Sequence, residues 1–183
     1  TPFGHTGEDA LCRAIARVRG IDPECPEAAA LYRHNEQSLR VVEAIENDGR
    51  GLNLTPEVRD GILCHTGPVP AETLEGRIVA VADRIAYVNH DIDDAIRAGI
   101  LREGDLPAST RKVLGCDHSS RIETLVVDMV RTSSVEGDIR LSPGIWAAMA
   151  ELRAFLFDNV YTCDAVMEEV VKAMRLVEVL FSY

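Results

Sequence analysis

The sequence predicts an all-α fold, and three observations lead to this prediction. Apolar side chains recur at spacings of three and four residues along most of the chain, as on one face of a helix. No segment shows the alternation of apolar and polar residues that marks a half-buried strand. Hydrophobic residues make up 46% of the chain but aromatic residues only 5%, which fits helices packed through alanine, leucine and valine. At 183 residues the chain is long enough for a core, so we expect one domain over 1–183.

Nine helical segments follow from these apolar runs and from the residues that bound them. In chain order they cover residues 6–20, 27–32, 34–49, 56–65, 73–98, 110–115, 119–133, 143–159 and 164–183. The acidic residues at 8–9 are expected in the first turn of the first segment, where the helix dipole favours negative charge, and Gly20 ends that segment. The Asn-Asp-Gly sequence at 47–49 stops the third segment, and Thr55 followed by Pro56 starts the fourth.

The C-terminal segments are bounded in the same way. Gly99 and Gly104 bracket the end of the fifth segment, which is the longest one. The polar residues at 117–120 precede the seventh segment, and Ser142 with Pro143 caps the eighth. The sequence contains no internal repeat and no low-complexity tract, so we expect these segments to pack as a helical bundle.

The fifth segment is the element around which the rest of the chain is expected to pack. At about 1.5 Å per residue it would span about 39 Å, enough to cross a domain of this size. Its apolar residues form one helical stripe: Leu74, Ile78, Val81, Ile85, Val88, Ile92 and Ile96. The opposite side carries polar residues: Asp83, Tyr87, His90, Asp91 and Asp94. A solvated acidic face is the simpler interpretation, but the tyrosine and the histidine favour a face that lines a site.

Charge and cysteine content exclude several classes of function. The formal net charge of -11 excludes an extended basic surface for nucleic acid or for a membrane, although a small phosphate pocket with a few arginines stays compatible with it. No apolar run approaches the length of a membrane span. The five cysteines are odd in number and form no Cys-x-x-Cys pair, which argues against a disulfide framework and for a reducing cytoplasm.

Two histidines stand in polar settings at expected helix starts. His5 and Glu8 are three residues apart, so their side chains can face each other, and a carboxylate beside an imidazole fixes its tautomer and favours its protonated form. This pair suits a general acid, although the spacing alone favours an ordinary capped helix with a nearby histidine. His34 lies in the polar run 33–37, which fits either a binding site or a simple N-terminal turn of a helix.

Asp83 is a candidate metal ligand. It is a carboxylate in the middle of a helix, and a hard divalent ion held by histidine and carboxylate ligands could use it. No pair of histidines four residues apart accompanies it, so a complete metal site cannot be assembled from this chain alone.

Five segments of the chain carry a family resemblance. They are TPFGHTGE (1–8), RHNEQSLRVVE (33–43), GLNLTPEVRDGIL (51–63), TLEGRIVAVADRIAYVNHDIDDAIRAGIL (73–101) and FLFDNVYT (155–162). In this order they resemble the HD-domain deoxynucleotide triphosphohydrolases, in particular the bacterial dGTP triphosphohydrolase-like group. The resemblance implies an HD-domain-like helical bundle around the long central helix. It also implies a His-Asp pair and an upstream histidine before the first segment. Because the chain opens at Thr1 without an initiator methionine, we expect a fragment that lacks these residues.

The resemblance implies roles in phosphate chemistry for four residues. His5 matches the catalytic histidine that protonates the leaving oxygen, and Glu8 matches its carboxylate partner. His34 resembles the histidine that contacts the phosphates. Arg84 stands where the family keeps a basic residue for the phosphate chain.

Three further residues of the central segment take implied roles in sugar and metal binding. Tyr87 resembles the aromatic residue that packs on the deoxyribose, and Asp91 resembles the acid that takes its 3′-hydroxyl. Asp83 matches the distant aspartate of the metal site. The implied cofactor is a divalent metal ion, Mn²⁺ or Mg²⁺, with Fe, Zn and Ni as alternatives.

The resemblance thus predicts a metal-dependent hydrolase that converts a dGTP-like deoxynucleoside triphosphate to deoxynucleoside and inorganic triphosphate. It implies a homo-oligomer, and the fragment alone is expected to lack turnover. Two alternatives stay open: another HD-type phosphohydrolase acting on a different nucleotide, and a noncatalytic nucleotide-binding regulatory module. The sugar clamp formed by Tyr87 and Asp91 favours the first prediction.

Overall fold

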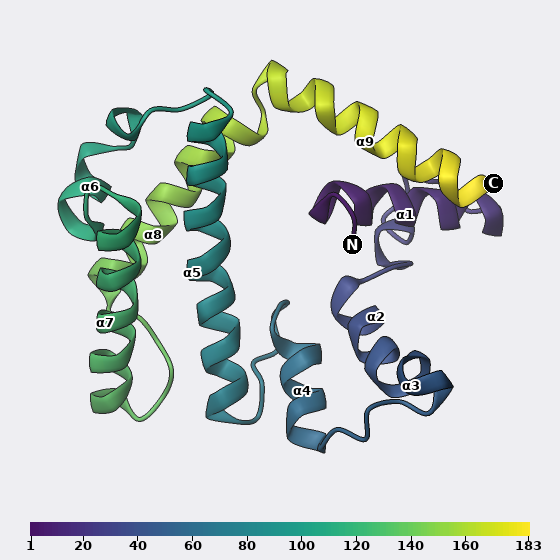
Figure 1. Cartoon of the computed structure of the whole chain (residues 1–183), viewed down its shortest axis with the longest axis horizontal. Coiled ribbons are helices and arrows are strands. Elements are labelled where there is room, and N and C mark those ends of the chain that lie inside the picture. Colours follow the sequence, from purple (N-terminus) through teal and green to yellow (C-terminus); the bar gives the residue numbers. More distant parts are fainter. The chain divides into compact units, whose positions relative to one another are not determined.

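The structure is a computed structural model that describes residues 1–183, and it is all-α, as predicted (Figure 1). It contains nine α-helices and no strand. The helices are α1 (Gly4–Arg19), α2 (His34–Arg40), α3 (Glu46–Gly49), α4 (Pro56–Cys64), α5 (Leu74–Arg97), α6 (Ala108–Leu114), α7 (His118–Glu136), α8 (Pro143–Leu156) and α9 (Asp164–Ser182). None of these helices combines the length and the apolar character needed to cross a membrane.

Every predicted segment contains a helix or a helical turn, and several predicted end signals are confirmed. Gly20 follows α1 with a left-handed φ of 68°. At the start of α5, where no cap was predicted, the Thr73 hydroxyl accepts a hydrogen bond from the backbone N–H of Gly76 at 3.1 Å. At the start of α7, an Asp117 carboxylate oxygen accepts from the Ser120 N–H at 3.0 Å, and the Ser120 hydroxyl accepts from the Asp117 N–H at 3.2 Å. These reciprocal bonds satisfy amides that have no partner within the helix.

Three predicted segments differ from expectation in detail. The acidic residues at 8–9 were expected in the first turn of α1. Because α1 already begins at Gly4, they lie beyond that turn. A π-helical turn, Val41–Ile45, divides the third predicted segment into α2 and α3. A second π-helical turn, Phe157–Tyr161, ends the eighth segment after α8. Such turns hold one extra residue, and the apolar period of a sequence does not reveal them.

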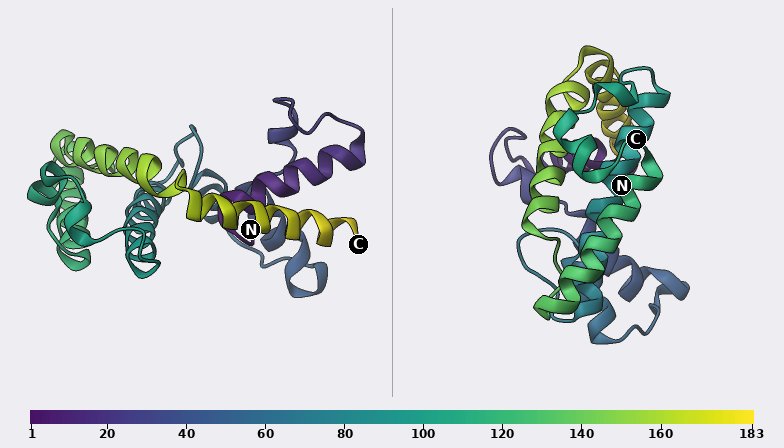
Figure 2. Two further views of the ribbon diagram at one scale, coloured as in Figure 1. Left: turned by 90° about the horizontal axis from the view of Figure 1, so that it is seen from above. Right: turned by 90° about the vertical axis from the view of Figure 1, so that its left-hand side faces the viewer.

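The chain forms two compact units. Unit 1 comprises Thr1–Leu63 and Asp164–Tyr183, and unit 2 comprises Cys64–Cys163. Figure 2 gives two further views of their helices. The single domain expected over 1–183 stays a prediction.

Unit 2 is built around α5, which packs against α7 and α8, while α6 packs against α7 and α8 as well (Figure 1). Its core consists of large apolar side chains that are almost completely buried: Ile85, Val88, Ile92, Leu106, Leu114, Leu125, Leu152 and Leu156. The predicted apolar stripe of α5 is confirmed at 85–92, but Leu74 and Ile78 are 48% and 41% exposed. The prediction is wrong at these two positions because periodicity identifies a helix face and not the neighbour that covers it.

A buried polar pair, absent from the sequence prediction, joins α5 to α7. Arg121 Nε donates a hydrogen bond to Asn89 Oδ1 at 3.1 Å, and Asn89 Nδ2 donates to the Ile85 carbonyl at 2.8 Å. Burial lowers the pKa of Arg121, and the Asp93 carboxylate, 3.8 Å from Nη2, opposes that shift. Because removing either partner would leave a buried polar group alone, the pair fixes α7 against the middle of α5.

In unit 1, α1 and α9 lie side by side (Figures 1 and 2). An ion pair joins them, with Arg17 Nη1 2.7 Å from Glu178 Oε2. The buried residues of this unit are all small: Gly7, Ala10, Cys12, Ala14, Ala16, Ala28 and Gly51. No residue of α9 is buried, although the helix is rich in valine, leucine and methionine.

Candidate active site

His5 and Glu8 lie on the first turns of α1, and the backbone before them folds back over the helix. Phe3 has a left-handed φ of 61°. Gly7 approaches the Pro2 carbonyl so closely that a Cβ on Gly7 would lie 1.8 Å from the oxygen. Only glycine fits this position, so it fixes the path of the residues that flank His5.

Glu8 binds His34 at the start of α2. Its Oε1 accepts a hydrogen bond from the backbone N–H of His34 at 2.9 Å, and its Oε2 lies 3.0 Å from His34 Nδ1. The first amides of a helix lack partners within the helix, and the dipole favours negative charge beside them, which explains the position of this carboxylate. The Glu8 and His34 side chains are 17% and 31% exposed, so solvent still reaches the pair.

The His5 ring meets the His34 ring edge to face, with centroids 6.3 Å apart and ring planes at 85°. Unit 1 therefore brings together the three residues predicted for proton transfer and phosphate contact. The carboxylate of Glu8, however, binds His34 and not His5, which differs from the expected pairing. His34 offers both a backbone amide and a ring nitrogen to one carboxylate, and spacing within one helix cannot reveal a partner 26 residues away.

The other four predicted site residues lie on α5 in unit 2. Asp83 is exposed, whereas Tyr87 and Asp91 are partly buried. Because α5 is one uninterrupted helix, these three follow one another at intervals of about one turn on a single face, as predicted. Arg84 lies next to this face, and its guanidinium carbon is 6.0 Å from the centre of the Trp146 ring, within the range of a cation–π contact.

One residue beside this face was absent from the predicted site. Tyr161, at the end of the π-helical turn after α8, donates a hydrogen bond from its hydroxyl to Asp91 Oδ2. Burial raises the pKa of Tyr161, and the Asp91 carboxylate and then Tyr87 raise it further. The segment 155–162 forms part of the family resemblance, but no spacing indicates that its tyrosine meets α5.

The chain contains no group of three or more histidine, cysteine, aspartate or glutamate side chains arranged to hold a metal ion. The residues present therefore do not fit a complete metal site. The metal-ligand role expected for Asp83 stays a prediction.

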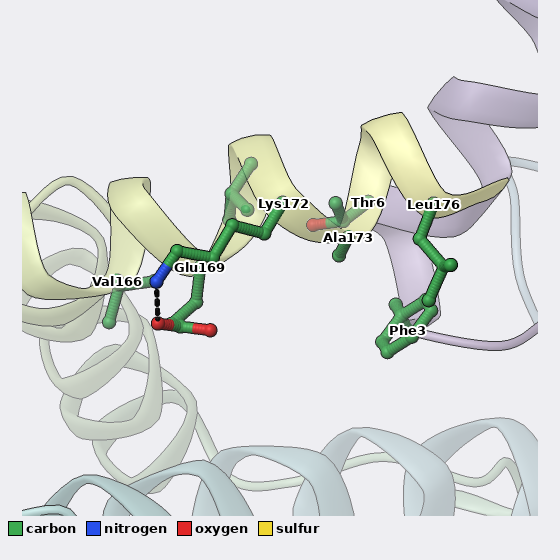
Figure 3. Close-up of a pocket in the computed structure, with 8 residues that line it drawn as sticks. Phe3, Thr6, Val166, Glu169, Lys172, Ala173 and Leu176 are labelled. Atoms are coloured by element: carbon green, nitrogen blue, oxygen red, sulfur yellow. Dashed lines mark hydrogen bonds and ion pairs between the residues drawn. The ribbon is translucent and has the colours of Figure 1, made fainter. Parts of the chain in front are cut away.

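Two clefts of unit 1 contain none of the predicted site residues in their lining. The larger, about 380 Å³, is formed by the start of α1 and by α9, and mostly apolar side chains line it: Phe3, Thr6, Val166, Glu169, Val170, Lys172, Ala173 and Leu176. Figure 3 shows Phe3 next to Leu176 and the Lys172–Glu169 ion pair, whose atoms are 2.7 Å apart. The other cleft, about 290 Å³, is more polar, with Val42, Glu43, Arg50, Asn53, Leu54 and Arg59 as its lining.

Comparison with known proteins agrees with the resemblance found in the sequence. The family described as phosphohydrolase-associated domain matches residues 139–183. A deoxyguanosinetriphosphate triphosphohydrolase-like protein of Caldanaerobacter subterraneus subsp. tengcongensis is 45% identical over 183 residues, which cover 100% of this chain and 50% of that protein. A protein of the same name from Clostridium perfringens is 48% identical, over 99% of this chain and 52% of its own length. Another, from Desulfatibacillum aliphaticivorans, is 40% identical over 100% of this chain.

These matches cover both units and all seven predicted site positions, because they extend over essentially the whole chain. The chain spans about half the length of the curated relatives it matches. The predicted resemblance is thereby confirmed: the chain is a homologue of the deoxyguanosinetriphosphate triphosphohydrolase-like proteins.

Proposed function

We propose that the whole protein hydrolyses a deoxynucleoside triphosphate to a deoxynucleoside and inorganic triphosphate. The names of the relatives support a triphosphohydrolase, and the observation that carries the proposal is the cluster of His5, Glu8 and His34. A histidine held by a carboxylate next to a second, exposed histidine is a suitable arrangement for proton transfer beside an anionic substrate.

The proposed reaction needs a proton at the departing sugar oxygen. Water attacks the α-phosphorus, the bond from phosphorus to O5′ breaks, and O5′ leaves as an alkoxide unless it is protonated. His5 is exposed at the start of α1 and would donate that proton. The bonds from Glu8 hold His34 in one orientation, with Nδ1 turned to the carboxylate and the ring edge to face with His5, and His34 would contact the phosphates from this position.

The sugar and the phosphate chain would be bound from α5. Tyr87 would pack on the deoxyribose, Asp91 would accept a hydrogen bond from the 3′-hydroxyl, and Arg84 would contact the phosphates. The contact with the Trp146 ring supports this role for Arg84, because stacking on an aromatic ring restricts a guanidinium and lowers the entropy lost when it binds an anion.

We further propose that the whole protein depends on a divalent metal ion, Mn²⁺ or Mg²⁺, with Asp83 as one ligand. This chain alone does not provide a complete ligand set, so it should bind Mn²⁺ weakly. Calorimetric titration of the 183-residue chain measures this, and tight stoichiometric binding would contradict it. Self-association and a cytoplasmic location rest on the resemblance and on cysteine content, and sedimentation of the whole protein tests the former.

Product analysis tests the proposed function. The whole protein is incubated with dGTP and Mn²⁺, and the products are separated by anion exchange. Deoxyguanosine and triphosphate in equal amounts are expected. Recovery of only diphosphate and orthophosphate would indicate a different nucleotide phosphohydrolase, and binding without any product would indicate a regulatory module.

A further inference from the structure

Tyr161 reaches the sugar-binding face of α5 from a part of the chain that sequence reasoning left without a role. It ends the π-helical turn Phe157–Tyr161, within the region matched by the phosphohydrolase-associated family. Its hydroxyl donates a hydrogen bond to Asp91 Oδ2, 70 residues away in sequence. The Asp91 carboxylate makes no other hydrogen bond and no ion pair, so this tyrosine is what restrains it.

The surroundings keep Tyr161 a donor. The side chain is partly buried, and burial together with the Asp91 carboxylate raises its pKa, so the phenol stays protonated at neutral pH. A protonated phenol beside an ionised carboxylate has one arrangement, in which the hydroxyl donates and the carboxylate accepts. Tyr87, one turn before Asp91 on the same face of α5, adds to the same rise in the pKa of Tyr161.

We propose, on the basis of the proposed function, that Tyr161 is a positioning residue that anchors Asp91 through Oδ2 and leaves Oδ1 to accept the sugar 3′-hydroxyl. An aspartate on a helix surface rotates about two side-chain bonds. Anchoring one carboxylate oxygen fixes the plane of the group, so that the second oxygen keeps one direction before substrate arrives. Tyr87, one turn earlier on α5, would then hold the ring of the same sugar against that oxygen.

This arrangement ties Tyr161 to one hydroxyl of the substrate. A nucleotide that lacks the 3′-hydroxyl gains nothing from an oriented Asp91. The Tyr161→Phe substitution keeps the ring and removes only the donor, so it should weaken recognition of the 3′-hydroxyl and little else.

The test compares dGTP with 2′,3′-dideoxy-GTP on the whole protein. Tyr161→Phe should lower kcat/KM for dGTP by about tenfold, the range for a hydrogen bond to a charged group, and change the value for the dideoxy nucleotide by less than about twofold. Tyr32→Phe is the matched control, because its hydroxyl bonds to the exposed Thr1 hydroxyl at 3.3 Å and should affect neither. Equal losses with both nucleotides would show a merely structural tyrosine, and no loss or a gain with dGTP would also overturn the proposal.

A double-mutant cycle identifies the route of the effect. If Tyr161 acts through Asp91, adding Tyr161→Phe to the Asp91→Asn variant should lower its kcat/KM for dGTP by less than a further factor of about two. A further loss as large as that of Tyr161→Phe alone would contradict the proposal. Equilibrium dialysis of both nucleotides accompanies the kinetics. If the wild type binds dGTP but forms no triphosphate, the proposed function fails while the binding ratio still tests Tyr161. A wild type that binds neither nucleotide overturns both.

Discussion

The two units bury different kinds of side chain. Unit 2 has a core of leucine, isoleucine and valine side chains, whereas only glycine, alanine and cysteine residues are buried in unit 1. Burial of a large aliphatic side chain contributes about 1.5–3 kcal/mol, and burial of an alanine contributes far less. Unit 2 should therefore resist local opening, while unit 1, which carries the histidines, should open at lower free energy. The more stable unit is thus unit 2, and the residues expected to transfer protons lie in the less stable unit 1.

The largest effect should come from Ile92→Ala. Ile92 is completely buried in unit 2, and truncating such a side chain costs about 2–5 kcal/mol of unfolding free energy. Ile78→Ala, on the same helix but 41% exposed, is the matched control and should cost much less. Urea unfolding with hydrogen exchange measures both. Equal losses of unfolding free energy in the two variants would contradict the difference between the buried middle and the exposed start of α5.

His5→Ala should lower kcat of the whole protein by roughly a hundredfold or more, the range for a lost general acid. KM should change little, because proton transfer matters mainly in the transition state. Asp9→Asn, an exposed change on the same helix, serves as the control. An unchanged rate in His5→Ala would remove His5 from the mechanism.

Sugar selectivity should depend on unit 2. Tyr87→Ala should narrow the preference for dGTP over GTP by about ten- to a hundredfold, because the tyrosine ring would no longer force a 2′-hydroxyl into an unpaired position. Asp91→Asn should lower kcat/KM for dGTP and for GTP by the same factor. The ratio of kcat/KM values measures this, and an unaltered ratio in Tyr87→Ala would show that the ring does not select the sugar.

Glu8→Gln should give a smaller loss, about tenfold, and the loss should fall mainly on KM. The amide oxygen of glutamine still accepts the backbone N–H of His34, but its NH₂ group replaces the carboxylate oxygen that faces Nδ1, so the His34 ring loses its charged partner. Steady-state kinetics with dGTP separates this from His5→Ala. A loss confined to kcat would instead indicate that Glu8 acts with His5 in proton transfer.

The smallest effect concerns acid stability of unit 2. Hydrogen bonds from Arg77 and then Arg140 lower the pKa of Asp138 below its ordinary value of 3.8. Because the folded pKa is below the unfolded one, this stabilisation is present above about pH 4 and is lost as the pH falls through the folded value. Asp138→Asn should reduce the melting temperature slightly at neutral pH and not at pH 2.5. The same reduction at both values would point to packing and not to charge.

The helices were predictable from sequence because their signals are local. Gly20 and the Asp117–Ser120 pair act on residues within one or two turns, and each lies where it was expected. The face of α5 that carries Asp83, Tyr87 and Asp91 follows from helical geometry alone.

Contacts between distant segments were not predictable. Nothing in the spacing of His5 and Glu8 indicates that the carboxylate binds His34, and nothing in 155–162 indicates that Tyr161 meets Asp91. Both depend on how segments pack, and in the second case on a π-helical turn that no apolar period records. The exposure of Leu74 and Ile78 was not predictable for the same reason, because it also depends on how the segments pack.

Because Phe157–Tyr161 is a π-helical turn, the position of the Tyr161 side chain depends on the number of residues in the turn as well as on their identity. Deleting a single residue would restore ordinary α-helical winding and swing the following side chain about 100° around the axis. The Tyr161 hydroxyl would then leave Asp91 although neither residue had changed. When relatives are aligned, a one-residue gap here should be counted as loss of the tyrosine, even where the letter is kept.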